Sequence, residues 1–221
     1  MHYSSYYAAL DDKFGDQDPL PKSPVIVDLG CGPGTTLFAL ADWMRKRRKG
    51  SSRIAYLGID ISRPLRDIAW EMIRGESLFD ESCIIMRESV EQVADADLAK
   101  LAHDRDGVIF ALSYIVHQEF MHDMTLLASL MERVRTHTND LDAWFLLQDA
   151  NFADRPDEHT EIWPENRLNV LANRCDRLGY RLRPQKVRFA APRVTITEDG
   201  QFRTEEAGPT DNVCRFFQKI A

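Results

Sequence analysis

The chain has 221 residues, with 28 Lys and Arg against 35 Asp and Glu and a formal net charge of −7. Apolar residues make up 44% and charged residues 29%, a composition typical of a folded globular protein that argues against disorder. No apolar run approaches the roughly 18 residues that a membrane span needs, so we expect no membrane partner. The acidic balance disfavours, without excluding, a protein whose main task is to bind nucleic acid.

Residues 1–24 form a polar, aromatic segment that ends in three prolines, Pro19, Pro21 and Pro24. We expect a short helix and then a loop that leads into the domain. The segment has neither the basic start nor the apolar stretch of a secretory signal. The four cysteines are far apart, which is typical of free thiols in a reducing compartment, and together these features predict a cytoplasmic protein.

From Val25 onward, apolar strands alternate with helices. Short apolar runs predict five buried strands, at residues 25–29, 56–60, 83–86, 107–112 and 143–147. Apolar residues at helical spacing predict helices around residues 37–44, 65–73, 98–102, 124–134 and 168–178. This alternation is typical of βαβ units, so we predict one α/β domain over residues 25–221, with a mostly parallel sheet covered on both faces.

The C-terminal part follows a different pattern. Residues 180–189 and 213–220 read as two strands with no helix between them, and we expect them to pair antiparallel. Between them, residues 194–204 contain Asp199-Gly200, a pair typical of a tight hairpin turn. We therefore expect an added β-hairpin over one end of the sheet.

A glycine-rich loop follows the first predicted strand, in the sequence Val25-Ile-Val-Asp-Leu-Gly-Cys-Gly-Pro-Gly-Thr-Thr36. Its glycines, Gly30, Gly32 and Gly34, let a ligand lie against bare backbone at the start of a helix. The third glycine comes one residue too early for the dinucleotide fingerprint G-x-G-x-x-G. Asp28 would repel a pyrophosphate but attract a cation, so the pattern favours S-adenosylmethionine, which carries an ammonium and a sulfonium.

The segment from Val27 to Thr35 resembles motif I of the class I S-adenosylmethionine-dependent methyltransferases, nearly residue for residue. The resemblance extends to Tyr56-Leu-Gly-Ile-Asp-Ile-Ser62 and covers about residues 22 to 221. It implies a Rossmann-like, doubly wound sheet of seven strands with an antiparallel C-terminal strand, and S-adenosyl-L-methionine as the cofactor. On this interpretation the N-terminal segment, residues 1–24, is a candidate lid over the cofactor.

The resemblance also assigns cofactor contacts. It implies that Asp28 and the glycine loop hold the amino-acid end and that the Asp60 carboxylate accepts both ribose hydroxyls, since a carboxylate has only acceptors. Glu88 and Ser89 would contact the adenine, although the family more often has Asp at position 88, and a solvated helix-capping role for Glu88 stays open. The candidate cofactor residues are Asp28, Gly30, Cys31, Gly32, Pro33, Gly34, Asp60, Ile61, Glu88, Ser89 and Ser113.

The segment after the fourth predicted strand, Ala111-Leu-Ser-Tyr-Ile-Val-His-Gln118, bears on the acceptor. It lacks the Asn/Asp-Pro-Pro-Tyr of base amino methyltransferases and the Pro-Cys of cytosine C5 enzymes. It is similar to the Ser-x-x-x-His pattern of many small-molecule methyltransferases. His117 is therefore the candidate catalytic base, because the unperturbed pKa of histidine lies near neutrality. A histidine that only packs beside the cofactor is an equal alternative.

We therefore predict methyl transfer from S-adenosylmethionine to an O or N atom of a small-molecule acceptor. The segment Asp149-Ala150-Asn151 matches the metal-dependent catechol type poorly, so we expect no catalytic metal. Two alternatives stay open: an RNA-modifying enzyme that uses the basic run Arg45–Lys49 as a grip, and a cofactor-binding subunit without catalysis. A solvated helix end is the simpler explanation of the run, since cations complement the helix dipole there. The oligomeric state is not predicted.

Overall fold

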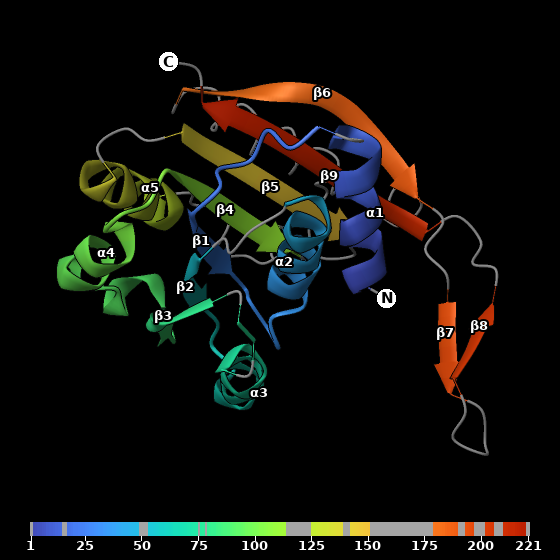
Figure 1. Cartoon of the computed structure of the whole chain (residues 1–221), viewed down its shortest axis with the longest axis horizontal. Helices are drawn as coiled ribbons and strands as arrows, with labels where there is room; N and C mark the ends of the chain where they lie inside the picture. The colour runs from blue at the N-terminus through green and yellow to red at the C-terminus, as the bar shows by residue number, and fades with distance from the viewer. Residues whose placement is uncertain are drawn as a thin grey trace.

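The computed structural model describes residues 2–14, 17–48, 53–74, 76–77, 79–113, 125–138, 142–150, 179–189, 193–196, 202–205 and 210–219. Its centre is a sheet in which five parallel strands lie in the order β3-β2-β1-β4-β5 (Figure 1). These strands are β1 (Pro24–Leu29), β2 (Ile54–Ile59), β3 (Phe79–Arg87), β4 (Gly107–Ser113) and β5 (Asp142–Ala150). The predicted α/β, Rossmann-like fold with a parallel sheet is confirmed.

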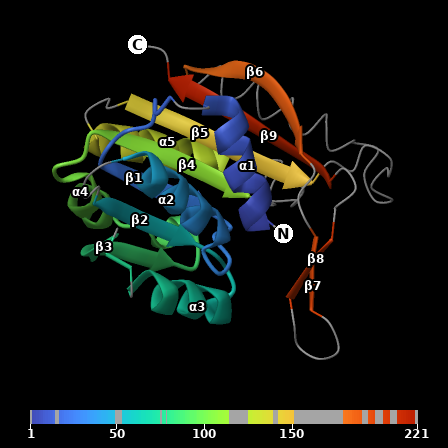
Figure 2. The ribbon, with the colours of Figure 1, turned by 45° about the vertical axis from the view of Figure 1, so that its right-hand side comes forward.

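Helices cover both faces of the sheet (Figures 1 and 2). They are α1 (His2–Phe14), α2 (Thr35–Arg47), α3 (Arg63–Arg74), α4 (Asp95–Ala102), α5 (Thr125–His137) and a short 3₁₀-helix, η1 (Val90–Gln92). Successive side chains of β1 point to opposite faces, so Val25 and Val27 pack with α4 and α5 in one cluster. Ile26 packs with α1, α2 and α3 in the other cluster. The predicted helix around residues 168–178 lies outside the described residues.

The described part of the N-terminal segment is a helix, α1, followed by a loop, as the sequence predicts. Tyr6 and Leu10 of α1 are almost fully buried, and the Phe14 ring packs edge-on against Trp144 and at a tilt against Trp43. The ring centroids of Phe14 lie 5.6 Å from Trp43 and 5.5 Å from Trp144. The helix therefore contributes to the core on this face of the sheet.

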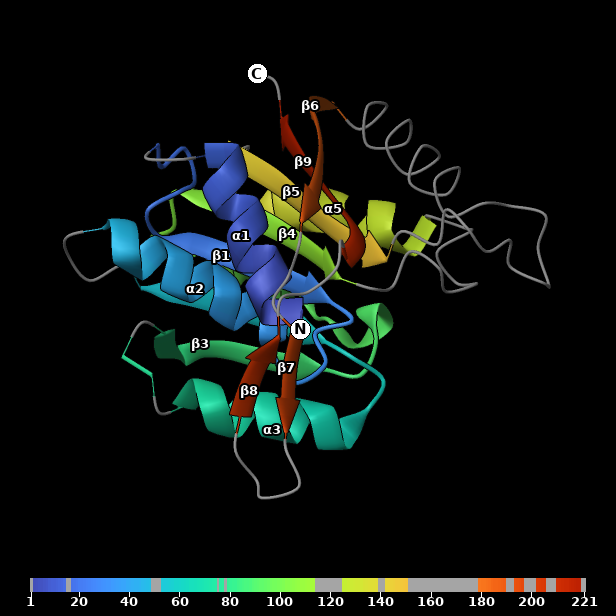
Figure 3. The same ribbon diagram turned by 90° about the vertical axis from the view of Figure 1, so that its right-hand side faces the viewer.

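The C-terminal strands lie beyond β5. Strand β9 (Thr210–Lys219) pairs antiparallel with β5 on one side and with β6 (Tyr180–Phe189) on the other. Two further short strands, β7 (Arg193–Ile196) and β8 (Phe202–Glu205), pair only with each other among the described strands. Figure 1 and Figure 3 show this pair extending away from the main sheet.

Strand β3 forms one edge of the sheet and is longer than the predicted run of residues 83–86. Its first part is polar, with Asp80 partly exposed and Glu81 and Ser82 exposed. The pairing with β2 shifts register between Ile54 and Tyr56, so the edge carries an irregularity there. The polar start broke the apolar run, which is why the sequence showed only the buried part of the strand.

The order of the parallel strands places the expected ligand crevice. Strand β1 is paired with β2 on one side and with β4 on the other, so the direction of winding reverses at β1. In open α/β sheets ligands bind at such a point, beyond the carboxyl ends of the strands. Within the described residues, no helix has the length and apolar character needed to cross a membrane.

Candidate functional site

The glycine loop connects the end of β1 to α2 in a conformation that only glycine adopts without strain. Gly30, Gly32 and Gly34 have φ angles of 68°, 51° and 81°, all in the left-handed region. The backbone N–H groups of Gly30 and Cys31 both donate to the carbonyl oxygen of Ile59, at 2.8 and 3.1 Å. The loop is therefore fastened to the end of β2, the strand next to β1.

The space over this loop is open. A Cβ atom added at Gly32 would meet no atom within 4 Å, whereas one at Gly34 would lie 3.2 Å from the Phe38 ring. The Cys31 side chain is buried, and burial raises the pKa of its thiol far above the ordinary value, so it stays protonated. Cys31 can therefore offer a ligand its backbone rather than a reactive sulfur, with Pro33 half-buried beside it.

Asp60 follows β2 and holds the loop through two backbone hydrogen bonds. Its Oδ2 accepts from the N–H of Gly32 and its Oδ1 accepts from the N–H of Ser62, both at 2.8 Å. Each carboxylate oxygen has a second lone pair, so both can still receive a hydroxyl proton. The guanidinium of Arg66 donates to the carbonyl oxygen of Asp60 and restrains this residue from α3. Asp60 is thus both a fixed acceptor and a brace of the glycine loop.

Asp28, near the end of β1, is completely buried. The hydroxyl of Tyr56 donates to its Oδ2 at 3.1 Å, and its Oδ1 has no hydrogen-bond partner among the described residues. Burial raises the pKa of the Asp28 carboxyl to about 7, an effect that the hydrogen bond from Tyr56 partly offsets and that the charge of Asp60 reinforces. The carboxyl group therefore lies beneath the loop and is not displayed to solvent.

A pocket of about 460 Å³ opens at the carboxyl ends of β1 and β2. It brings together Gly30, Asp60, Ile61, Glu88 and Ser89, five of the residues that the sequence predicted to contact a cofactor. Among the described residues, its lining is Leu29, Gly30, Ile59, Asp60, Ile61, Glu88, Ser89, Val90, Glu91 and Leu126. This size is in the range of pockets that hold a drug-sized or nucleoside-like ligand.

Two exposed apolar side chains, Ile61 and Leu126, belong to this pocket. They are 83% and 42% exposed, and a flat ring placed in the pocket would cover apolar surface that now faces water. Leu126 was missed from the sequence because it reaches the pocket from α5, far along the chain. Its position just inside the start of a helix that follows β4 is the only signal that could have indicated it.

Glu88 lies at the end of β3 with an exposed side chain. Its backbone N–H donates to the side-chain oxygen of Gln92 at 3.1 Å. The residue at the cap position of η1 is Ser89, and its side chain makes no capping hydrogen bond. Glu88 therefore lines the pocket without being the cap residue of this helix, and its contact with an adenine stays a prediction.

Ser113 ends β4, and its hydroxyl oxygen accepts a short hydrogen bond from the hydroxyl of Thr36. The two hydroxyl oxygens lie 2.6 Å apart and join the first turn of α2 to the end of β4. His117, the candidate catalytic base, lies outside the described residues. Among those that are described, no group of three or more His, Cys, Asp or Glu side chains is placed to share a metal ion.

The basic run at the end of α2 holds the helix to neighbouring segments. Arg45 pairs with Asp42, Arg47 with Asp11 and Arg48 with Asp18. The ammonium of Lys46 lies over the ring of Tyr7, 5.6 Å from its centroid. The expected solvated helix end holds only for Arg45, because the side chains of Arg47 and Arg48 are 15% and 10% exposed. All three arginines of the run are paired with carboxylates.

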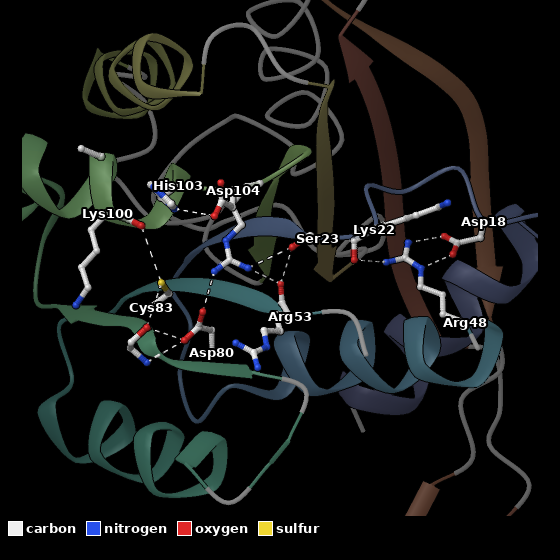
Figure 4. A pocket seen from close by; sticks show the side chains of 13 residues that line it. Asp18, Lys22, Ser23, Arg48, Arg53, Asp80, Cys83, Lys100, His103 and Asp104 are labelled. Atoms are coloured by element: carbon white, nitrogen blue, oxygen red, sulfur yellow. Dashed lines mark hydrogen bonds and ion pairs between the residues drawn. The ribbon is translucent and has the colours of Figure 1, made fainter. Parts of the chain in front are cut away.

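A larger cavity, of about 980 Å³, lies at the opposite edge of the sheet (Figure 4). Its residues precede β1, β2 and β4 or belong to the first half of β3, so it opens at the amino ends of the strands. Figure 4 shows Arg48 facing Asp18, and Asp80 below the loop that carries Ser23. None of the residues that the sequence predicted to bind a cofactor lies in it.

Comparison with known proteins identifies the fold. No family model matches the chain, and no curated protein matches it in sequence. Among solved structures, a SAM-dependent methyltransferase from Aquifex aeolicus is similar, with a TM-score of 0.51 at 14% identity over 99% of this chain and 92% of that one. The YcgJ protein from Bacillus subtilis gives 0.54 at 11% identity, over 98% of this chain and 99% of that one.

A third similar structure holds a ligand. The glycopeptide N-methyltransferase MtfA, solved in complex with S-adenosyl-L-methionine, gives a TM-score of 0.52 at 14% identity over 99% of this chain and 87% of that one. The glycine loop, Asp60 and the pocket beside them lie where such a fold binds its ligand, at the carboxyl ends of the parallel strands. The chain has the fold of the class I S-adenosylmethionine-dependent methyltransferases.

Proposed function

We propose that the protein is an S-adenosylmethionine-dependent methyltransferase that methylates an O or N atom of a small-molecule acceptor. The observation that carries the proposal is the geometry around Asp60. Its carboxylate braces an open, left-handed glycine loop on one side and lines a pocket of about 460 Å³ on the other. The fit to the cofactor is supported by what these residues offer, which is carboxylate oxygens that can accept from hydroxyl groups, a glycine backbone that a ligand can approach closely, and apolar walls.

Different residues would contact the three parts of the cofactor: its amino-acid end, its ribose and its adenine. Asp28 and the loop from Gly30 to Gly34 would hold the amino-acid end, and Asp60 would accept the ribose hydroxyls. Ile61 and Leu126 would cover the faces of the adenine, with Glu88 and Ser89 at its edge. The cofactor supplies an electrophilic methyl group on a sulfonium, and the chain contributes catalysis mainly by holding the acceptor in line with it.

The acceptor must lose a proton as its oxygen or nitrogen is methylated. We propose that His117 takes this proton, since it follows β4 and the carboxyl end of that strand faces the crevice. Ser113, whose Oγ lies 2.6 Å from Oγ1 of Thr36, would lie on the side of the crevice where the methyl acceptor binds. His117→Ala should then lower turnover by about 10²- to 10⁴-fold and leave cofactor affinity nearly unchanged.

The proposal extends to three features predicted from the sequence. We take β9 and β6 as the remaining strands of a seven-stranded methyltransferase sheet and β7–β8 as an added hairpin. We take the N-terminal segment, residues 1–24, as a lid over the cofactor. We also propose a cytoplasmic enzyme.

Calorimetric titration with S-adenosylmethionine, with its demethylated product S-adenosylhomocysteine and with NAD tests the proposal. We expect binding of the first two and none of NAD. The absence of binding by both methyl-donor ligands, or tighter binding of NAD, would contradict it. Binding without turnover on any acceptor would instead indicate a cofactor-binding subunit.

A filter-binding titration tests the choice of a small-molecule acceptor over RNA. We expect no sub-micromolar RNA affinity at near-physiological salt, because the arginines of the basic run pair with carboxylates. Tight RNA binding that is lost when residues 45–49 are neutralised would overturn this choice.

A further inference from the structure

We infer that Tyr56 is a positioning residue for the cofactor: its hydroxyl occupies one oxygen of Asp28 and leaves the other to receive the ammonium group of the cofactor. This inference rests on the proposed function, because it assumes that the amino-acid end of S-adenosylmethionine lies over the glycine loop. It assigns a role to a residue that reads in the sequence as an ordinary apolar strand position.

The register of β1 and β2 brings the two side chains together. Asp28 lies directly opposite Gly58, and Tyr56 lies two residues before Gly58 on the same face of β2. A Cβ atom at Gly58 would lie 2.8 Å from Cε1 of Tyr56 and 2.6 Å from the sulfur of Met86. The missing side chain at position 58 therefore makes the room in which the Tyr56 ring leans toward Asp28.

Packing fixes the direction of the Tyr56 hydroxyl. The residue is fully buried, and its ring is held between Gly58 and the surrounding core. The hydroxyl donates to Oδ2 of Asp28 at 3.1 Å. A buried phenol with one donor and one fixed acceptor holds the carboxyl in a single orientation, so the position of Oδ1 is fixed as well.

The surroundings of Asp28 contain no compensating cation among the described residues. From β2 it faces Tyr56, from the loop Cys31, and beyond β2 the carboxylate of Asp60. On the β4 side its opposite residue is Ala111, which has no polar side chain. The nearest cation that acts on this group of residues, Arg66, donates to the backbone of Asp60 instead. Burial and the charge of Asp60 disfavour the ionised carboxyl, and the hydrogen bond from Tyr56 offsets them only in part.

An unpaired buried carboxylate is costly, and the second oxygen of Asp28, Oδ1, has no hydrogen-bond partner in the part of the chain that the structure describes. A bound ammonium group supplies both the positive charge and the hydrogen-bond donor that Asp28 lacks. Asp28 lies two residues before Gly30 and is buried beneath the loop, and the space over Gly32 in this loop is open. An amino-acid end of the cofactor that lies over the loop would therefore come close to Asp28.

The arrangement has a measurable consequence in the proton balance of binding. Burial keeps the Asp28 carboxyl largely protonated below pH 7, and the ammonium group requires it ionised. Binding in this range must therefore release a proton, so affinity should rise with pH and level off above about pH 7. The Tyr56 hydroxyl stabilises the ionised form, and removing it should move the levelling point upward.

The experiment titrates the full chain with S-adenosylhomocysteine between pH 5.5 and 8.5. We expect the wild type to bind up to about tenfold more tightly per pH unit below pH 7, the limit for one released proton. Tyr56→Phe should shift the levelling point upward by about 0.5 to 1 unit and weaken binding by about 3- to 10-fold at pH 6.5. Most of this loss should be recovered at pH 8.5.

Two controls isolate the ammonium group and the hydroxyl. 5′-Methylthioadenosine has the adenosine and the thioether but no ammonium, so its binding should not depend on pH or on Tyr56→Phe. Tyr6→Phe removes the hydroxyl of another buried tyrosine, on α1, and should leave the pH profile of the wild type unchanged.

The outcomes separate this inference from the proposed function. Failure of the wild type to bind S-adenosylhomocysteine at any pH contradicts the proposed function itself. Binding with the same pH profile in wild type and Tyr56→Phe contradicts only the role of Tyr56. If Tyr56→Phe does not fold, calorimetric titrations of the wild type in two buffers of different ionisation enthalpy decide. They should show proton release on binding of S-adenosylhomocysteine and none on binding of 5′-methylthioadenosine. Equal proton release with the two ligands overturns the inference.

Discussion

One pocket lies at the amino ends of the parallel strands, the amino edge of the sheet, and another at their carboxyl ends, the carboxyl edge. The two regions differ in how many of their charged groups have hydrogen-bond or ion-pair partners within the chain. At the amino edge, Arg105 pairs with Asp80 and donates to the Ser23 hydroxyl and the Arg53 carbonyl. At the carboxyl edge, within the described residues, Asp28 keeps one oxygen without a hydrogen-bond partner, and Asp60 accepts from the backbone N–H groups of Gly32 and Ser62. Most charged groups described above for the larger cavity are thus paired within the chain, with Nε of Arg105 as an exception, whereas the carboxyl edge has carboxylate oxygens left for a ligand. Chemistry, rather than volume, identifies the site.

The largest expected effect is the loss of cofactor affinity in Asp60→Ala, compared with the removal of a carboxylate at the opposite edge. Asp60→Ala removes the acceptor for both ribose hydroxyls and the brace of the glycine loop. Each charge-assisted hydrogen bond contributes about 1.5–3 kcal/mol, so cofactor affinity should fall by at least about 100-fold. The matched variant Asp80→Ala, at the amino edge, should leave affinity within about twofold. Calorimetry on both variants gives the comparison, and equal losses would show that the two edges are not functionally distinct.

Arg105→Ala should affect stability rather than binding. The Arg105 side chain is only 5% exposed and joins β4 to the start of β2 and to Asp80 in β3. Its removal takes the ion pair from Asp80, which keeps the donors of Ser82, and one hydrogen bond from the Arg53 carbonyl, which keeps that of Ser23. We expect a cost of about 2–3 kcal/mol in the free energy of unfolding. Denaturant unfolding measures this loss. The folded variant should bind S-adenosylhomocysteine as the wild type does, and weakened binding would show coupling between the edges.

Asp28→Asn should show the opposite combination, with lost binding and gained stability. The pKa of Asp28 is about 7 in the folded chain against 3.8 for an ordinary aspartate. The folded state therefore binds more protons than the unfolded state between these values, and stability falls as pH rises toward 7.

The amide of Asn cannot ionise, so Asp28→Asn should exceed the wild type in stability at pH 8. We expect at least about 1 kcal/mol, or about 2–4 °C in Tm. The gain should disappear near pH 4, and thermal unfolding at both pH values tests it. A variant that is less stable than wild type at pH 8 would contradict the burial of an unpaired carboxyl.

Glu88→Gln should give the smallest effect, because Glu88 is exposed to solvent. If its carboxylate accepts from the adenine amine, the variant should lose less than about tenfold in affinity for S-adenosylhomocysteine, as for one solvated hydrogen bond. Glu91→Gln, in the same pocket, is the matched control and should change nothing. An identical response of both variants would remove Glu88 from the adenine site.

The parallel sheet could be predicted because its strands are apolar runs that stop at glycine or at a polar residue. The glycine loop and Asp60 could be predicted because each motif is contiguous in the sequence. Strand β3 shows the limit of this approach, since Asp80 and Glu81 interrupt its apolar run at the edge of the sheet.

The rest of the site depends on packing between distant segments. Leu126 and Val90 reach the pocket from α5 and η1, and no local pattern fixes where those helices begin relative to β2. The contact between Tyr56 and Asp28 depends on the register of two strands that are 28 residues apart. Register is set by the whole buried face, so the sequence around Tyr56 could not indicate the partner of its hydroxyl.

The irregular edge of β3 bears on how the protein behaves when it is concentrated. The free N–H and C=O groups of an edge strand are a template on which another chain can add, the first step of aggregation. Here the register shift near Ile54 disturbs the regular spacing of those groups, and Asp80 and Glu81 lie along the same edge. A second copy aligned on β3 would bring these carboxylates against like charges, so this edge resists the growth of intermolecular sheets.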